Sequence, residues 1–162
     1  MNKYKIALVD DHKLFREGLK LLLSNLDYVE DVYEASNGKE FLELMEKIPC
    51  DIVLMDIEMP VMNGIEATEK AVEIYPNLKI IALSMYGEEI YYYKMVEAGA
   101  KGFLLKDSGM ENVQEAIETV CDGSSYFSEE LLFNILQNMR TNKKIEEITG
   151  DLSDRELEIL CH

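Results

Sequence analysis

The feature that most constrains this chain is a regular alternation of short apolar runs with longer amphipathic stretches. Strand-forming apolar runs are each followed by a stretch with apolar residues at helical spacing. This order is typical of βαβ units, which build a parallel sheet covered by helices on both faces. The runs are 4–9, 29–35, 51–55, 79–83 and 102–105, and the helical stretches are 14–26, 37–48, 64–74, 88–98 and 110–121. We therefore predict an α/β fold with a doubly wound, five-stranded parallel sheet.

Composition excludes several other classes of protein. The chain is 48% hydrophobic, which supplies a core and argues against global disorder. No apolar run is long enough to span a membrane, and the N-terminus turns acidic at once, so neither a membrane anchor nor a secretory signal is expected. Cys50, Cys121 and Cys161 are widely spaced and form no CxxC pair. We expect free thiols and a cytoplasmic location rather than a disulfide framework or a zinc site.

The acidic net charge argues against direct DNA binding, and the last forty residues depart from the pattern of the first part. The net charge is −16, from 16 basic and 32 acidic residues, whereas a DNA-binding surface needs Lys and Arg. Beyond Gly123 we expect an extra helix at 128–139 and a polar linker at 140–150. A helix then begins near 152, with Ser153 and Glu156 as its capping box. The predicted regions are a first domain at 1–123, a helix and linker at 124–150, and the start of a second domain at 151–162. We expect the chain to be a fragment of a longer protein, or to end in a frayed tail.

Polar side chains follow four of the predicted strands. Asp10 and Asp11 follow the first, Asp56 the third, Ser84 the fourth and Lys106 the fifth. In a parallel sheet these positions meet at one edge. Clustered carboxylates repel one another and suit Mg²⁺, and a lysine suits phosphate oxygens. Each residue alone would be an ordinary cap, turn or surface residue. Together they favour phosphoryl transfer, with Asp56 as the nucleophile of an acyl phosphate.

Four ordered motifs then resemble a known family. The segments VDDHKLFREGL, LMDIEMPVMNGIEA, ALSMY and EAGAKGFLLKD closely resemble the receiver domain of bacterial two-component response regulators, over about residues 3–122. The segment LSDRELEIL resembles the opening of a helix-turn-helix output domain of the LuxR/NarL/FixJ type. The resemblance implies a flavodoxin-like receiver fold with strand order 2-1-3-4-5 and a C-terminal helical extension.

The resemblance also implies a role for each acid at the sheet edge. Asp56 matches the phosphoacceptor. Asp11 and Asp56 match the side-chain ligands of Mg²⁺, together with the backbone carbonyl of Glu58, and Asp10 matches the acid that acts on the metal through water. His12, next to the acidic pair, is interpreted as a helix-start or surface residue rather than a ligand.

Further matches concern the switch. Ser84 matches the switch hydroxyl, Lys106 the phosphate-binding lysine, and Phe103 the switch aromatic, which is expected to turn inwards when Ser84 moves. Pro60 and Gly64 match the loop after the third strand. Phosphorylation is expected to shift a pre-existing equilibrium between two states.

The implied partners follow from this reading. The phosphoryl donor is expected to be a sensor histidine kinase, and the chain is expected to assist only its own phosphotransfer and autodephosphorylation. We expect a homodimer on activation, because helix-turn-helix regulators read two half-sites, and DNA contact only through the missing output domain. The alternatives are a stand-alone receiver acting through protein contacts and a Mg²⁺-dependent phosphohydrolase of the haloacid-dehalogenase type. A nucleotide- or flavin-binding module is disfavoured, because no glycine-rich phosphate loop follows the first strand.

Overall fold

The computed structural model describes residues 3–85, 89–127 and 137, and within these ranges it contains each predicted strand and helix up to residue 121. The strands are β1 (Tyr4–Val9), β2 (Val29–Ala35), β3 (Ile52–Asp56), β4 (Lys79–Ser84) and β5 (Gly102–Leu105). The helices are α1 (Lys13–Ser24), α2 (Gly38–Lys47), α3 (Gly64–Ile74), α4 (Glu89–Ala98) and α5 (Met110–Cys121). The predicted segments at 128–139, 140–150 and 151–162 lie outside the described residues, apart from residue 137.

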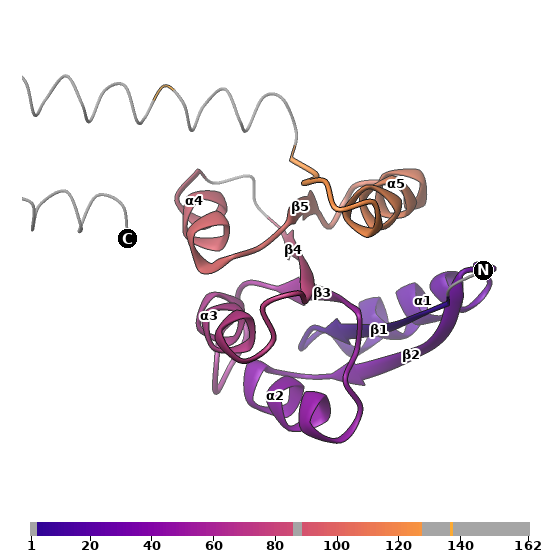
Figure 1. Ribbon diagram of the computed structural model, residues 1–162, viewed down its shortest axis with the longest axis horizontal. Coiled ribbons are helices and arrows are strands. Elements are labelled where there is room, and N and C mark those ends of the chain that lie inside the picture. Colours follow the sequence, from indigo (N-terminus) through magenta and orange to yellow (C-terminus); the bar gives the residue numbers. More distant parts are fainter. Residues whose placement is uncertain (1–2, 86–88, 128–136, 138–162) are drawn as a thin grey trace, which may run out of the picture.

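All strand pairs of the sheet are parallel, in the order β2-β1-β3-β4-β5 (Figure 1). This confirms the predicted fold class and strand order. The register aligns Val9 with Met55, and Asp56 with Leu83, so the carboxyl ends of the three central strands lie level with one another. β3 and β4 each run one residue further than predicted, to Asp56 and Ser84. Two of the candidate polar residues are therefore held by the sheet itself.

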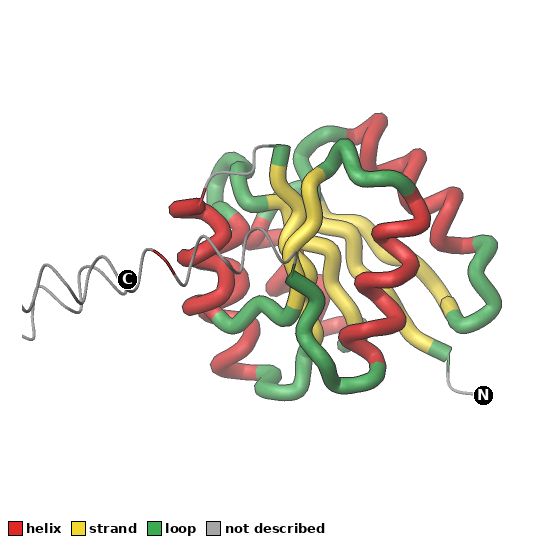
Figure 2. Tube along the Cα trace, turned by 90° about the horizontal axis from the view of Figure 1, so that it is seen from above, coloured by secondary structure: helices red, strands yellow, loops and turns green. Residues whose placement is uncertain are grey.

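Helices cover both faces of the sheet, because alternate strand residues point to opposite sides. Figure 2 shows the strands between helical layers. One apolar core packs strand residues such as Val53 and Ile80 against α2, α3 and α4. The other packs residues such as Leu54 and Ile81 against α1 and α5. The central strand β3 is buried along its whole length, as its uninterrupted apolar sequence predicts.

The chain that leaves α5 returns to the edge of the sheet. Tyr126 pairs with Gly102 beside β5, and its carbonyl accepts a hydrogen bond of 2.9 Å from the Phe103 amide. The Phe127 ring stands edge-on to Tyr92 of α4, whose ring stands edge-on to Phe103. Residues 126 and 127, which follow α5, are thus packed on the same edge as Phe103.

None of the helices in the described parts of the chain combines the length and the apolar character that crossing a membrane requires.

Candidate functional site

The carboxyl end of the sheet brings together the acids and the lysine that follow different strands. Asp10 and Asp56 are buried, with 2% and 4% of their surface exposed, while Asp11 is exposed. Lys106 lies just beyond β5, and its side chain is almost fully buried. Parallel strands with a level register place these groups at one edge. The structure therefore places the predicted acids and Lys106 in one cluster.

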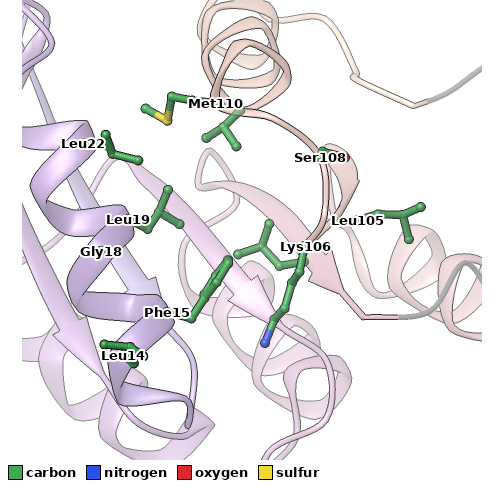
Figure 3. A pocket seen from close by; sticks show the side chains of 11 residues that line it. Leu14, Phe15, Gly18, Leu19, Leu22, Leu105, Lys106, Ser108 and Met110 are labelled. Carbon is green, nitrogen blue, oxygen red and sulfur yellow. The ribbon is translucent and has the colours of Figure 1, made fainter.

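The ammonium group of Lys106 joins the two buried acids. Its Nζ lies 2.7 Å from Asp10 Oδ2 and 3.3 Å from Asp56 Oδ2. The Lys106 side chain extends past the ring of Phe15 on α1, with Nζ 5.0 Å from the ring centroid (Figure 3). Its backbone amide donates a 2.8 Å hydrogen bond to the carbonyl of Ser84, which ties the turn after β5 to β4. One positive charge is thereby fixed against two buried negative charges.

The electrostatics of Asp56 follow from this arrangement. Burial, reinforced by the negative charge of Asp10, raises the pKa of Asp56 to about 7, and the positive charge of Lys106 opposes that rise. A carboxyl group with this pKa is only partly ionised at neutral pH. Additional positive charge at the cluster would favour the ionised, nucleophilic form.

The donor set of the cluster fits a divalent cation. Asp10, Asp11, His12 and Asp56 each offer a ligand atom, and these atoms lie within 4.8 Å of one another. Carboxylates at the solvent edge of a site suit Mg²⁺, which keeps several waters and uses one or two carboxylates. Glu58 lies two residues beyond Asp56 in the following turn, and its backbone carbonyl stays a predicted ligand.

Two further candidate residues lie beside this cluster. Ser84 is buried at the end of β4, next along the sheet from Asp56. Phe103 on β5 is also buried and packs against Tyr92, with ring centroids 4.9 Å apart. From the sequence, Phe103 is expected to turn inwards, but in the structure its ring is already buried. A switch at this position would exchange the partners of the ring rather than bury an exposed one.

The turn between β3 and α3 is shaped by backbone contacts. Asn63 caps α3, its side chain accepting a hydrogen bond from the Glu66 amide at 2.9 Å. The Gly64 amide donates to the carbonyl of Ile57 at 2.8 Å. A Cβ atom on Gly64 would lie 2.1 Å from the carbonyl oxygen of Asp56. Only glycine allows α3 to begin this close to the end of β3.

The same turn contains a strained residue. Val61 has a φ of 71°, and the Met62 amide donates to the Pro60 carbonyl at 2.8 Å, which closes a γ-turn around it. A β-branched residue is strained in this conformation. The Val61 side chain is 76% exposed, so little packing offsets the strain.

We expect Val61→Gly to raise the free energy of unfolding by about 1 kcal/mol, because relief of strain exceeds the entropy that glycine adds to the unfolded chain. Urea unfolding with an unchanged m-value would measure the gain. The matched control is Val96→Gly, at an exposed position of right-handed helix α4, which should lose about 0.3 kcal/mol, the difference in helix propensity between valine and glycine. Equal losses in both variants would contradict the strain.

Sequence reasoning missed the role of Arg16. Its guanidinium donates to the backbone carbonyl of Asp10 and, at 2.9 Å, to Glu34 on β2. Arg16 therefore holds the turn after β1 in place. The signal was an arginine in the first turn of the helix that follows the acidic pair.

Comparison with known proteins identifies the family of this chain. Residues 6–118 match the family model of the response regulator receiver domain. The chain is 37% identical to the transcriptional regulatory protein DegU of Brevibacillus brevis over 86% of its own length, and it spans 59% of that relative. It is 34% identical to the response regulator UvrY of Escherichia coli K12, covering 96% of this chain and 71% of that protein.

Solved structures give the same result. A LuxR-family two-component response regulator from Aurantimonas sp. SI85-9A1 aligns with a TM-score of 0.78 and 30% identity, over 85% of this chain and 99% of that one. The signal receiver domain of the putative response regulator NarL from Mycobacterium tuberculosis aligns with a TM-score of 0.70 and 35% identity, over 76% of this chain and 99% of that one.

Proposed function

The chain belongs to the response regulator receiver domain family, with LuxR/NarL-type regulators as relatives, and from that premise we propose that Asp56 accepts a phosphoryl group from a phosphohistidine of a sensor histidine kinase. The observation that carries the proposal is the buried Asp56 carboxylate, which lies within an acidic cluster and 3.3 Å from the Lys106 ammonium. The family does not support the alternative of a haloacid-dehalogenase-type hydrolase or of a nucleotide- or flavin-binding module.

The positions of the side chains support the following transfer step. An oxygen of the ionised Asp56 carboxylate attacks phosphorus, the N–P bond of the phosphohistidine breaks, and the imidazole leaves with the electron pair. Lys106 Nζ, between Asp10 and Asp56, is placed to contact a phosphoryl oxygen on Asp56. Asp11 and Asp56, with the carbonyl of Glu58, would hold Mg²⁺, and Asp10 would act through water. The ion supplies positive charge that offsets the charge of the transferred group.

The consequences for regulation are part of the same proposal. The phosphoryl group adds up to two negative charges and new acceptor oxygens, one of which the Ser84 hydroxyl would bind. Movement of Ser84 would change the packing of Phe103 against Tyr92. We place the readout in an output domain that binds DNA as a homodimer. The similarity to DegU, a transcriptional regulatory protein, supports the control of transcription.

The test is chemical. The full chain, incubated with Mg²⁺ and a small acyl-phosphate donor, should gain one phosphoryl group in an intact-mass measurement, and Asp56→Asn should gain none. Asp27→Asn, an identical change at an exposed position outside the cluster, should gain the group as the parent does. An adduct that persists in Asp56→Asn, or that forms equally well with a chelator present, would overturn the proposal.

A further inference from the structure

We propose that His12 supplies an imidazole nitrogen as a ligand at the cation site. This nitrogen strengthens the binding of late transition-metal dications such as Ni²⁺, beyond the binding that the carboxylates alone provide. The inference deepens the proposed function and rests on it for the presence of a cation at these acids. It concerns one residue, which the sequence alone placed at the start of a helix.

The backbone holds His12 against the acidic pair. His12 is the N-terminal cap of α1, and its amide donates a 2.8 Å hydrogen bond to Asp10 Oδ1. Its ring nitrogen Nδ1 lies 3.1 Å from Asp10 Oδ1 and 3.6 Å from Asp11 Oδ1. Two ligand atoms bound about 2.1 Å from one ion can be as far apart as about 4.2 Å. A single ion can therefore contact Nδ1 and either of these carboxylates without a change of fold.

His12 Nδ1 also lies 3.1 Å from Lys106 Nζ. An ammonium group can only donate a hydrogen bond, and an imidazole nitrogen has a single lone pair, so an ion bound to Nδ1 would take the place of this contact with Lys106. Lys106 would keep its contacts with Asp10 and Asp56, at 2.7 and 3.3 Å.

The buried acids add an independent observation. Asp10 Oδ2 and Asp56 Oδ2 are buried at the cluster, and neither has a hydrogen bond of good geometry, although Lys106 lies close to both. One ammonium group, that of Lys106, faces the three carboxyl groups of the cluster, and a bound cation would supply the further positive charge that buried carboxylates need. The donors that converge on this point are thus three carboxylates and one imidazole.

The mixed donor set determines which ions benefit. Carboxylates and water suit Mg²⁺, whereas imidazole suits Ni²⁺, Cu²⁺ and Zn²⁺. Carboxylates alone also bind Ni²⁺ more tightly than Mg²⁺. The contribution of His12 is therefore measured by how far the preference for Ni²⁺ over Mg²⁺ falls when His12 is replaced. The side chain is 59% exposed, which leaves its far edge to solvent while Nδ1 faces the acids.

The experiment uses the full chain in a His162→Ala, Cys161→Ser background, because His162 is the only other histidine and its neighbour is a thiol. Calorimetric titration with Ni²⁺ and with Mg²⁺ is compared between this parent and its His12→Ala variant. We expect the Ni²⁺ affinity to fall at least tenfold and the Mg²⁺ affinity to change less than threefold. Equal changes for both ions, or no change for Ni²⁺, would overturn the inference.

Two further measurements locate the ligand. Asp11→Asn should weaken Ni²⁺ binding, and an unchanged affinity would place the ion elsewhere and refute the inference. Electron spin echo measurements with Cu²⁺ should show modulation from an imidazole nitrogen in the parent and none in His12→Ala.

Phosphoryl uptake on Asp56 of the parent with Mg²⁺ is measured separately. Loss of that uptake speaks against the proposed function, whereas equal Ni²⁺ affinities with normal uptake speak against the role of His12 alone.

Discussion

Gly64→Ala is expected to lower the free energy of unfolding by about 3 kcal/mol, one of the largest effects of a single methyl group in this chain. The added Cβ would meet the Asp56 carbonyl oxygen at 2.1 Å, and the next nearest atoms, the Asp56 carbonyl carbon and Ile57 Cα, are also backbone. No flexible side chain can move aside. The start of α3 must retreat from β3, at a cost at the upper end of that for overpacking in a core. The same retreat displaces the backbone of Asp56, so phosphoryl uptake should fall as well.

The matched control is Gly18→Ala. Gly18 lies on the exposed side of α1, and a Cβ atom there has open space around it. Alanine is the better helix former, so the control should gain up to about 1 kcal/mol. Urea unfolding with constant m-values would give both numbers. A Gly64→Ala variant within 0.5 kcal/mol of the parent would show, on the scale of surface substitutions, that the turn yields easily.

The difference between these glycines shows what the sequence alone could and could not predict. Hydrophobic periodicity located the strands and helices, since burial on one or two faces imposes its period on the residues. It could not tell that Gly64 lies against Asp56, because that contact depends on the path of the turn after β3. The resemblance to receiver domains did mark Gly64 as part of a shaped loop.

The cluster itself was predictable for a similar reason. Parallel strands bring their carboxyl ends to one edge, so Asp10, Asp56 and Lys106 could be expected together without coordinates. Which of these side chains contact one another could not be predicted. Lys106 Nζ reaches His12, 94 positions earlier in the chain, only because β1, β3, β4 and β5 are neighbours in that order and Lys106 is buried beside Phe15. The direction of the His12 ring is set by that packing and has no sequence signal of its own.

In metal-free buffer, Asp56→Asn is expected to raise the free energy of unfolding at pH 8 by about 2 kcal/mol. Burial and the charge of Asp10 raise the pKa of Asp56 from 3.8 to about 7 in the folded protein. The folded state therefore binds a proton more tightly than the unfolded chain, and wild-type stability falls as pH rises from about 4 to 7. At about 1.4 kcal/mol per pKa unit the full cost is about 4 kcal/mol, which we halve because the protein and nearby water relax around a buried charge. Asparagine has no such charge to bury.

The stability difference between Asp56→Asn and wild type should depend on pH. The gain in the free energy of unfolding from Asp56→Asn should be complete above pH 7. It should shrink towards zero near pH 4, where the folded wild type, like the variant, carries a neutral group at position 56. Asp27→Asn, an exposed control, should stay within 0.5 kcal/mol of the parent throughout. A constant difference across the range would assign the effect of Asp56→Asn to packing rather than to the buried charge.

Magnesium should reverse the order of the two proteins at pH 8. An ion that binds only the folded state stabilises it by about 2.7 kcal/mol at one hundred times its dissociation constant. Wild type can gain this stabilisation because Asp56 is one of the proposed ligands, whereas the Asp56→Asn variant has lost one carboxylate of the set. Thermal unfolding with chelator and then with excess Mg²⁺ would measure both states of each protein. The charge that destabilises the bare fold is then the charge that binds the cation. Equal gains in both proteins would show that Mg²⁺ binds without Asp56 and would remove it from the ligand set.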